Sequence, residues 1–128
     1  MGDCPRDPAI RVLMMPRDTN YHGTIFGGII LSHIDQAGAV GTLKAGCRQV
    51  VTVAMDKVVF QQPVHVGDLV SFYTEVTRIG NTSITVRIQV EAERRTENES
   101  LPVTKADMTF VNVDDEGKPT PVPRPQEI

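Results

Sequence analysis

The residues best suited to chemistry lie between positions 20 and 35: an asparagine, a pair of glycines and an aspartate. Asn20 stands in a turn-rich segment and offers an amide that can orient water or a carbonyl group. Gly27 and Gly28 precede an apolar run, where the backbone N–H groups of a helix N-terminus favour negative charge. Asp35 follows about two turns later. An amide, an anion-binding backbone and a carboxylate together are suited to acyl transfer.

Asp35 and Asn20 each have a second interpretation. Asp35 falls at the edge of the apolar helix face, between Leu31 and Gly38. An aspartate there is either a boundary residue, salt-bridged or half-exposed, or a partly buried general base or nucleophile. Asn20 is either functional or a residue that stabilises its own turn through its side chain. The pattern alone leaves these alternatives open.

One long helix is predicted to position these groups. The run from Ile29 to about Ala45 has a helical period, which places on one side Ile30, Ile34, Ala37, Gly38, Gly41 and Ala45. Glycine weakens a helix, so glycines on the apolar face indicate that another backbone passes very close. Gly46 is a suitable C-cap for this helix.

Five strands are predicted around the helix. Residues 10–15, 50–60, 69–79, 82–94 and 103–113 are rich in β-branched or alternating apolar residues. In the fourth run the alternation is clearest, so one face should be buried and the other exposed. Gly80 and Asn81 between the third and fourth runs indicate a two-residue hairpin turn. This order predicts an α+β fold in which the helix packs on one face of an antiparallel sheet of about five strands.

The composition indicates one globular domain and excludes several kinds of function. The chain has 128 residues, of which 40% are hydrophobic and 23% charged, with a net charge of −3. A pI near 5.5 argues against a broadly basic surface for nucleic acid. No apolar stretch is long enough to span a bilayer, and the first residues lack the apolar region of a secretion signal. We therefore expect a cytoplasmic protein.

The cysteines and histidines do not indicate a metal site. Cys4 and Cys47 are too few for a disulfide framework or a zinc ligand set, so we expect two reduced thiols. His22, His33 and His65 lack the spacing of metal ligands. His33 falls on the outer side of the predicted helix, which favours a solvated surface residue.

The end of the chain differs from the rest. Proline occupies positions 119, 121, 123 and 125. Proline at every second position cannot pair in a central strand. We therefore predict a single domain at residues 1–116 and an extended, polyproline-like tail at residues 117–128.

Several segments together resemble a known family. The run from Met15 to Ala39 is similar to the signature of hotdog-fold acyl-CoA thioesterases, in particular the YciA-like and brain-type acyl-CoA hydrolase group. Further downstream, similar segments occupy residues 51–54, 56–60, 63–64, 66–70 and 78–83. The resemblance runs from about Met15 to Val113 and does not include the proline-rich tail. Tyr21 and His22 depart from the family pattern and put the acyl preference in doubt.

The resemblance implies a fold, a reaction and an assembly. The fold would be a hotdog, one long helix wrapped by a curved antiparallel sheet, and the reaction would convert acyl-CoA and water into a free acid and coenzyme A. Asp35 would act as general base or nucleophile, and the N–H of Gly28, with Gly27, would bind the thioester oxygen. Asn20, from the other subunit, would position water or the thioester. Active sites would lie at a homodimer interface, in a hexamer built as a trimer of dimers, without a metal or another cofactor.

The resemblance also implies where coenzyme A binds. Part of its site would be the turn with Arg78, Gly80, Asn81, Thr82 and Ser83, while Val53 and Ala54 would flank the pantetheine arm. Lys57 is a further candidate for a phosphate contact, with Arg87, Arg94 and Arg95. For these four cations, a solvated charge on a strand face is an equally good interpretation.

Two other functions fit the same fold. One is a non-catalytic module that binds acyl-CoA or lipid, against which the presence of Asn20 and Asp35 argues. The other is a hydratase-type hotdog enzyme acting on enoyl-CoA, which would pair a histidine with a carboxylate. No histidine lies on the Asp35 side of the predicted helix, so His22 or His65 would have to come from elsewhere.

Overall fold

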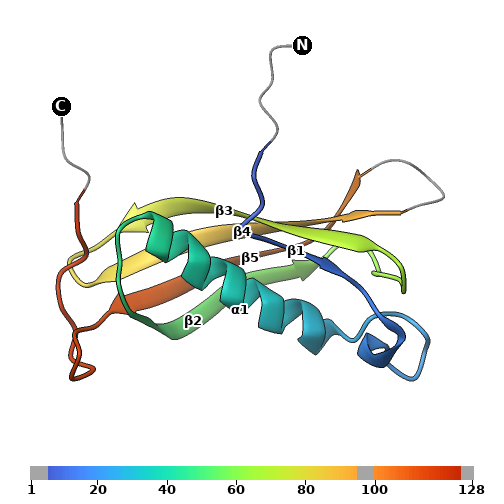
Figure 1. Cartoon of the computed structure of the whole chain (residues 1–128), viewed down its shortest axis with the longest axis horizontal. Helices are drawn as coiled ribbons and strands as arrows, with labels where there is room; N and C mark the ends of the chain where they lie inside the picture. The colour runs from blue at the N-terminus through green and yellow to red at the C-terminus, as the bar shows by residue number, and fades with distance from the viewer. Residues whose placement is uncertain (1–5, 95–99, 125–128) are drawn as a thin grey trace, which may run out of the picture.

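A curved sheet and one long helix make up the fold, which a computed structural model describes for residues 6–94 and 100–124 (Figure 1). The elements in chain order are β1 (Ile10–Leu13), the short 3-10 helix η1 (Pro16–Asp18), α1 (Gly27–Lys44), β2 (Val50–Phe60), β3 (Leu69–Ile79), β4 (Ser83–Glu93) and β5 (Ser100–Asn112). The strands follow the order β1-β3-β4-β5-β2, and every neighbouring pair is antiparallel. The predicted α+β hotdog architecture is therefore confirmed.

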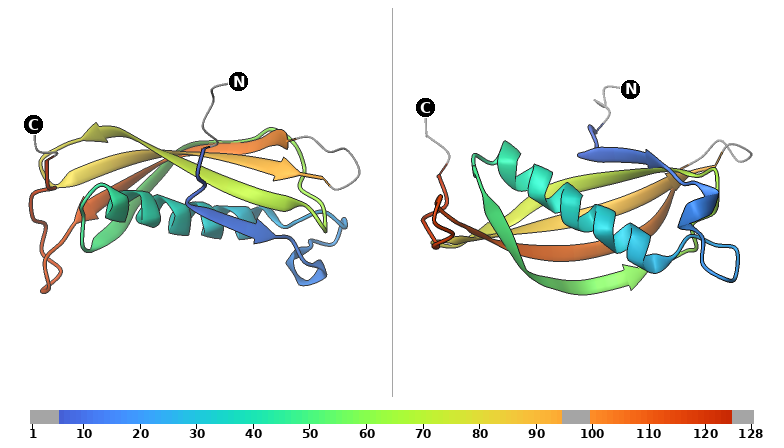
Figure 2. Two further views of the ribbon diagram at one scale, coloured as in Figure 1. Left: turned by 45° about the horizontal axis from the view of Figure 1, so that its top comes forward. Right: turned by 60° about the horizontal axis from the view of Figure 1, so that its bottom comes forward.

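The sheet wraps around α1 (Figure 2). Shifts in strand register bend it, between Thr52 and Ala54 and between Asp56 and Val59 in β2, and near the end of β3. Lys57, inside the second shift, has a φ of 55°, a left-handed conformation that is uncommon outside glycine. β2 is an outer strand of the sheet, and its far edge pairs with no other described strand.

The buried face of α1 agrees with the predicted periodicity except at its C-terminal end. Its buried residues are Ile30, Ile34, Ala37, Gly38, Gly41 and Thr42. Thr42 replaces the predicted Ala45 because the helix ends at Lys44 and Ala45 is its C-cap. The Thr42 hydroxyl donates to the carbonyl of Ala39 at 2.7 Å, which satisfies it inside the core. Gly46 follows with a φ of 104°, as expected of a glycine that ends a helix.

The helix glycines allow the close packing that the sequence indicates, but side chains rather than backbone fill the space. A Cβ atom at position 38 would lie 2.7 Å from Cζ of Phe110. A Cβ atom at position 41 would lie 3.1 Å from Cβ of Thr74. The expectation of an approaching backbone is thus wrong, because the sheet presents a phenylalanine ring and a threonine to the helix.

No helix of the described residues is both long and apolar enough to cross a membrane.

The described part of the predicted tail, up to Arg124, packs against the end of the sheet at the β3–β4 turn. Val122 is 3% exposed and belongs to the hydrophobic core.

Candidate active site

The N-terminus of α1 presents free backbone donors. Phe26 is the N-cap residue, in an extended conformation, and no side chain caps the helix. Its own N–H donates to the carbonyl of Asp18 at 2.8 Å, and the N–H of Ile29 donates to the Phe26 carbonyl at 2.9 Å. Within the described residues, the N–H groups of Gly27 and Gly28 donate to nothing. They are therefore free to bind an anion or a polarised carbonyl oxygen.

The exposed ring of Phe26 lies over the glycine at position 28. A Cβ atom there would lie 2.7 Å from Cε2 of Phe26. Any other residue would push this ring aside and change the approach to the helix N-terminus. Glycine at position 28 thus lets the Phe26 ring keep this position beside the backbone donors.

Asp35 is half-buried on α1 and bonds across to the outer strand. Its Oδ1 accepts a hydrogen bond from the Thr52 hydroxyl of β2 at 2.7 Å. Its other oxygen has no hydrogen-bond partner and no ion pair within the part of the chain that the structure describes. Asp35 is therefore partly exposed and has no salt bridge to a described residue, which fits both the boundary residue and the partly buried base. One of its oxygens remains to accept a proton.

Asn20 builds its own turn. Its Oδ1 accepts hydrogen bonds from the backbone N–H of His22 at 2.8 Å and of Thr24 at 3.3 Å. Its Nδ2 donates to the Thr24 hydroxyl at 3.0 Å. The local alternative for Asn20 is thus present in the single chain, and no hydrogen bond joins Asn20 to Asp35 there. One hydrogen on Nδ2 remains for another partner.

The turn between β3 and β4 has three residues, Gly80, Asn81 and Thr82, rather than the predicted two. The N–H of Gly80 donates to the carbonyl of Ser83 at 2.8 Å and closes the turn. The side chains of Arg78 and Asn81 are exposed. On β2, Val53 is exposed and Ala54 is half-buried beside the first register shift.

Two candidate phosphate-binding cations face a carboxylate on the outer face of the sheet. Arg87 Nε donates to Asp107 Oδ1 at 3.1 Å, and Lys57 Nζ lies 4.0 Å from Asp107 Oδ2. These charges agree with the solvated strand-face interpretation. Arg95, also named as a candidate, lies outside the described residues.

Arg94 has a structural partner. Its guanidinium donates to Asp68 Oδ2 at 3.2 Å and to the carbonyl of Pro63 at 2.6 Å. Asp68 is buried and also accepts the N–H of His65 at 2.9 Å. A buried carboxylate needs such partners. Arg94 therefore holds the loop before β3 and is not free for a phosphate.

His33 is half-buried rather than a solvated surface residue. Its Nδ1 lies 2.8 Å from the carbonyl of Ile29, and its ring centre lies 5.7 Å from that of Phe72. The prediction was wrong because the curved sheet reaches around to this side of the helix.

Cys47 is buried, and burial raises the pKa of its thiol, so it is a poor nucleophile at neutral pH. Cys4 lies outside the described residues.

A mostly apolar pocket of about 310 Å³ lies beside the N-terminus of α1. Ile25, Gly27, Ile30 and Phe60 line it, together with residues 61–64. The Phe60 ring is 51% exposed and reaches within 3.5 Å of the position that a Cβ atom on Gly27 would take. An apolar chain in this pocket would lie directly beside the free Gly27 donor.

The sequence alone missed Thr52 and Phe60. Thr52 is a polar residue between two exposed valines on the outer strand, and only the fold shows that it faces Asp35. Phe60 ends β2 and meets the start of α1, which is far away in the sequence.

Comparisons with known proteins agree with this geometry. Residues 22–99 match the thioesterase superfamily. The chain is 38% identical over 117 residues to the acyl-CoA thioester hydrolase YciA of Salmonella typhimurium, covering 89% of this chain and 88% of that one.

Solved structures are also similar. A hexameric hotdog-fold thioesterase of Campylobacter jejuni is 44% identical with a TM-score of 0.87, over 91% of this chain and 90% of that one. An acyl-CoA hydrolase of Staphylococcus aureus, solved with butyryl coenzyme A and coenzyme A, is 35% identical with a TM-score of 0.82, over 93% and 74% of the two chains. With this sequence similarity, this fold and this arrangement at the start of the helix, the chain belongs to the thioesterase superfamily, among its hotdog-fold acyl-CoA thioester hydrolases.

Proposed function

We propose that this protein hydrolyses acyl-CoA thioesters to a free carboxylic acid and coenzyme A. The observation that carries the proposal is one helix, α1, with two free backbone donors at its start and an accessible carboxylate at Asp35. Relatives that cover most of the chain are acyl-CoA thioester hydrolases, which supports the same reaction. A cytoplasmic location fits the buried, reduced thiol of Cys47.

Asp35 removes a proton from water as the water attacks the thioester carbonyl carbon. The carbonyl oxygen gains negative charge, and the N–H of Gly28, with that of Gly27, binds it at the positive end of the helix dipole. The carbon–sulfur bond then breaks, and coenzyme A leaves as the thiolate. In the alternative route Asp35 attacks the carbon itself, and water hydrolyses the resulting anhydride. Neither route needs a metal or redox cofactor, because a thioester is already activated.

The single chain does not complete this site. Asn20 would come from the other subunit of a homodimer and orient the water or the thioester with its remaining Nδ2 hydrogen. The outer strand β2 supports such an interface, because it carries exposed apolar side chains at Val51, Val53, Val59 and Phe60. An unpaired strand edge with apolar side chains readily pairs with another chain. The hexameric relative of Campylobacter jejuni supports a trimer of such dimers.

Free-thiol release tests the function. Wild-type protein is incubated with acyl-CoAs from short chains to palmitoyl, and coenzyme A appearance is followed. We expect release from at least one member of the panel. Coenzyme A binding without release from any of them would instead indicate a non-catalytic binding module. Water addition to an enoyl-CoA would indicate the hydratase-type alternative.

Phe60 is expected to limit the length of the acyl chain. Replacing it with alanine enlarges the apolar pocket beside Gly27, so kcat/KM for long acyl-CoAs should rise about tenfold relative to short ones. The acyl-CoA panel measures this ratio. Val76→Ala is the control, because Val76 is also an exposed apolar residue but lies on β3, outside both this pocket and the β2 interface. An unchanged chain-length profile in Phe60→Ala would show that the acyl chain binds elsewhere.

A further inference from the structure

Residues 119–124, here called the strap, cross the turn between β3 and β4. The N–H of Val122 donates to the carbonyl of Asn81 at 2.8 Å. The guanidinium of Arg124 donates to the carbonyl of Gly80 at 3.0 Å and to that of Ile79 at 3.3 Å. Figure 1 shows this C-terminal segment beside the β3–β4 turn, at the end of the sheet away from η1.

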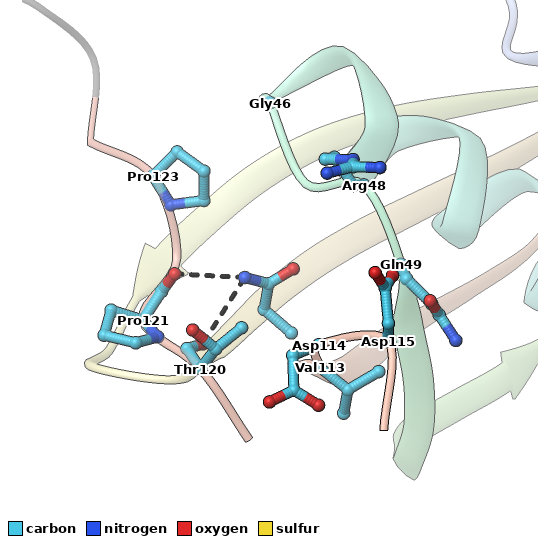
Figure 3. Close-up of a pocket in the computed structure, with 10 residues that line it drawn as sticks. Gly46, Arg48, Gln49, Val113, Asp114, Asp115, Thr120, Pro121 and Pro123 are labelled. Atoms are coloured by element: carbon cyan, nitrogen blue, oxygen red, sulfur yellow. Dashed lines mark hydrogen bonds between the residues drawn. The ribbon is translucent and has the colours of Figure 1, made fainter. Parts of the chain in front are cut away.

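The strap is anchored on the other side by the core. Val122 is 3% exposed. The N–H of Thr120 donates to the Asn112 carbonyl at 2.8 Å. The Asn112 side chain donates to the carbonyl of Pro121 at 3.0 Å, and a dashed line in Figure 3 ends on this carbonyl of the labelled Pro121. Pro123 lies against Gly46, within 3.6 Å of the position of a Cβ atom there. The strap therefore packs on the domain and is hydrogen-bonded both to the end of β5 and to the β3–β4 turn.

These contacts change the polarity of the turn. The strap engages the carbonyls of Ile79, Gly80 and Asn81. The carbonyl of Thr82 accepts the N–H of Asn112 at 2.8 Å. Four acceptors that would repel an anion are thereby satisfied.

The groups of the turn that remain unpaired are hydrogen-bond donors or carry positive charge. Within the described residues, the N–H groups of Asn81 and Thr82 donate to nothing, and the side chain of Arg78 has no hydrogen bond or ion pair. Arg124 adds a second positive charge at the same turn. Of the two acidic residues that line the pocket beside the strap, Asp114 and Asp115, Asp114 accepts the N–H groups of Glu116 and Lys118. Free N–H groups beside two guanidinium groups make an anion site.

We propose that the strap is part of the site for the nucleotide half of coenzyme A, with Arg124 as a positioning residue that also supplies charge to a phosphate. This inference rests on the proposed acyl-CoA hydrolysis. Arg124 holds the turn through its carbonyls, so that Arg78 and the free N–H groups face the ligand together. Arg124 should therefore strengthen the binding of substrates that carry the phosphates and should not affect the thioester chemistry.

The test compares two substrates that share an acyl group: an acyl-CoA and the S-acylpantetheine, which has no nucleotide. In Arg124→Ala we expect KM for the acyl-CoA to rise about fivefold, with kcat nearly unchanged and the kinetics on the S-acylpantetheine as in the wild type. Arg124→Lys should recover part of the loss. Lys118→Ala is the matched control, because it removes a charge of the same tail that is 74% exposed and does not contact the β3–β4 turn.

Direct binding gives a readout that does not need turnover. Calorimetry should show that Arg124→Ala binds coenzyme A more weakly than the wild type does but binds pantetheine equally well. Equal losses of affinity for coenzyme A and for pantetheine, or an unchanged affinity for coenzyme A, would overturn the role of the strap. A wild-type protein that binds coenzyme A but releases no thiol would refute the proposed function, while the binding comparison would still decide the role of Arg124.

Discussion

Replacing Asp35 with asparagine is expected to lower kcat for acyl-CoA hydrolysis at least about 100-fold, the lower end for loss of a general base. The amide cannot take a proton from water or attack the thioester. Its oxygen can still accept the hydrogen bond of the Thr52 hydroxyl, which is 2.7 Å from Asp35 Oδ1 in the wild type. The change therefore removes the chemistry and keeps the packing. Thiol release at saturating substrate measures the effect.

The control for this variant lies on the same helix. Ser32 is exposed, and its hydroxyl donates only to the carbonyl of Ile29, at 2.8 Å. Ser32→Ala should keep the wild-type kcat, and all three proteins should unfold at similar temperatures. A well-folded Asp35→Asn protein with wild-type turnover would contradict the assigned role of Asp35.

The largest expected loss of stability is that of Phe110→Ala. Phe110 is 1% exposed, and its ring fills the space that Gly38 leaves on the buried face of α1. Removing the ring opens a cavity between helix and sheet, which the rigid sheet fills only in part. We expect the free energy of unfolding to fall by about 3–5 kcal/mol. Urea denaturation at fixed protein concentration measures it.

Tyr21 supplies the comparison for Phe110. It is also aromatic but 93% exposed, so Tyr21→Ala should change the free energy of unfolding by no more than about 0.5 kcal/mol. Phe110→Leu, which keeps most of the volume, should fall between the two. Equal stabilities of the Phe110→Ala and wild-type proteins would show that the helix and the sheet do not pack as described.

Local patterns were enough to predict the main elements. The alternation in β4 and the helical period of α1 each follow from which face of one element is buried, and β2 and β3 have the predicted bounds. The ends of other elements differ from the predicted ends, because pairing with a neighbouring strand determines where a strand begins and ends. β5 begins at Ser100 rather than at Val103 since its first residues still pair with the end of β4.

The site was less accessible to sequence reasoning. The spacing of Gly27, Gly28 and Asp35 is a local property. The sequence places the two glycines just before a predicted helix that starts at Ile29, whereas α1 begins at Gly27, so both glycines lie in its first turn. The contacts of Asp35 with Thr52 and of Arg124 with the β3–β4 turn join residues far apart in the chain, so only the fold reveals them. Arg94 was a candidate for a phosphate contact, with a solvated charge as the equal alternative, because its ion pair with the buried Asp68 is not visible in the sequence.

The most direct test of the composite active site is complementation between two inactive variants. Asn20→Ala and Asp35→Asn are purified, unfolded together and refolded as a mixture. If Asp35 of one subunit works with Asn20 of the other, mixed dimers contain one intact site, and random pairing restores about a quarter of the wild-type rate. Thiol release from acyl-CoA measures the recovered activity. Recovery to that level is the expected result, and a mixture no more active than its two components would contradict a site shared between subunits.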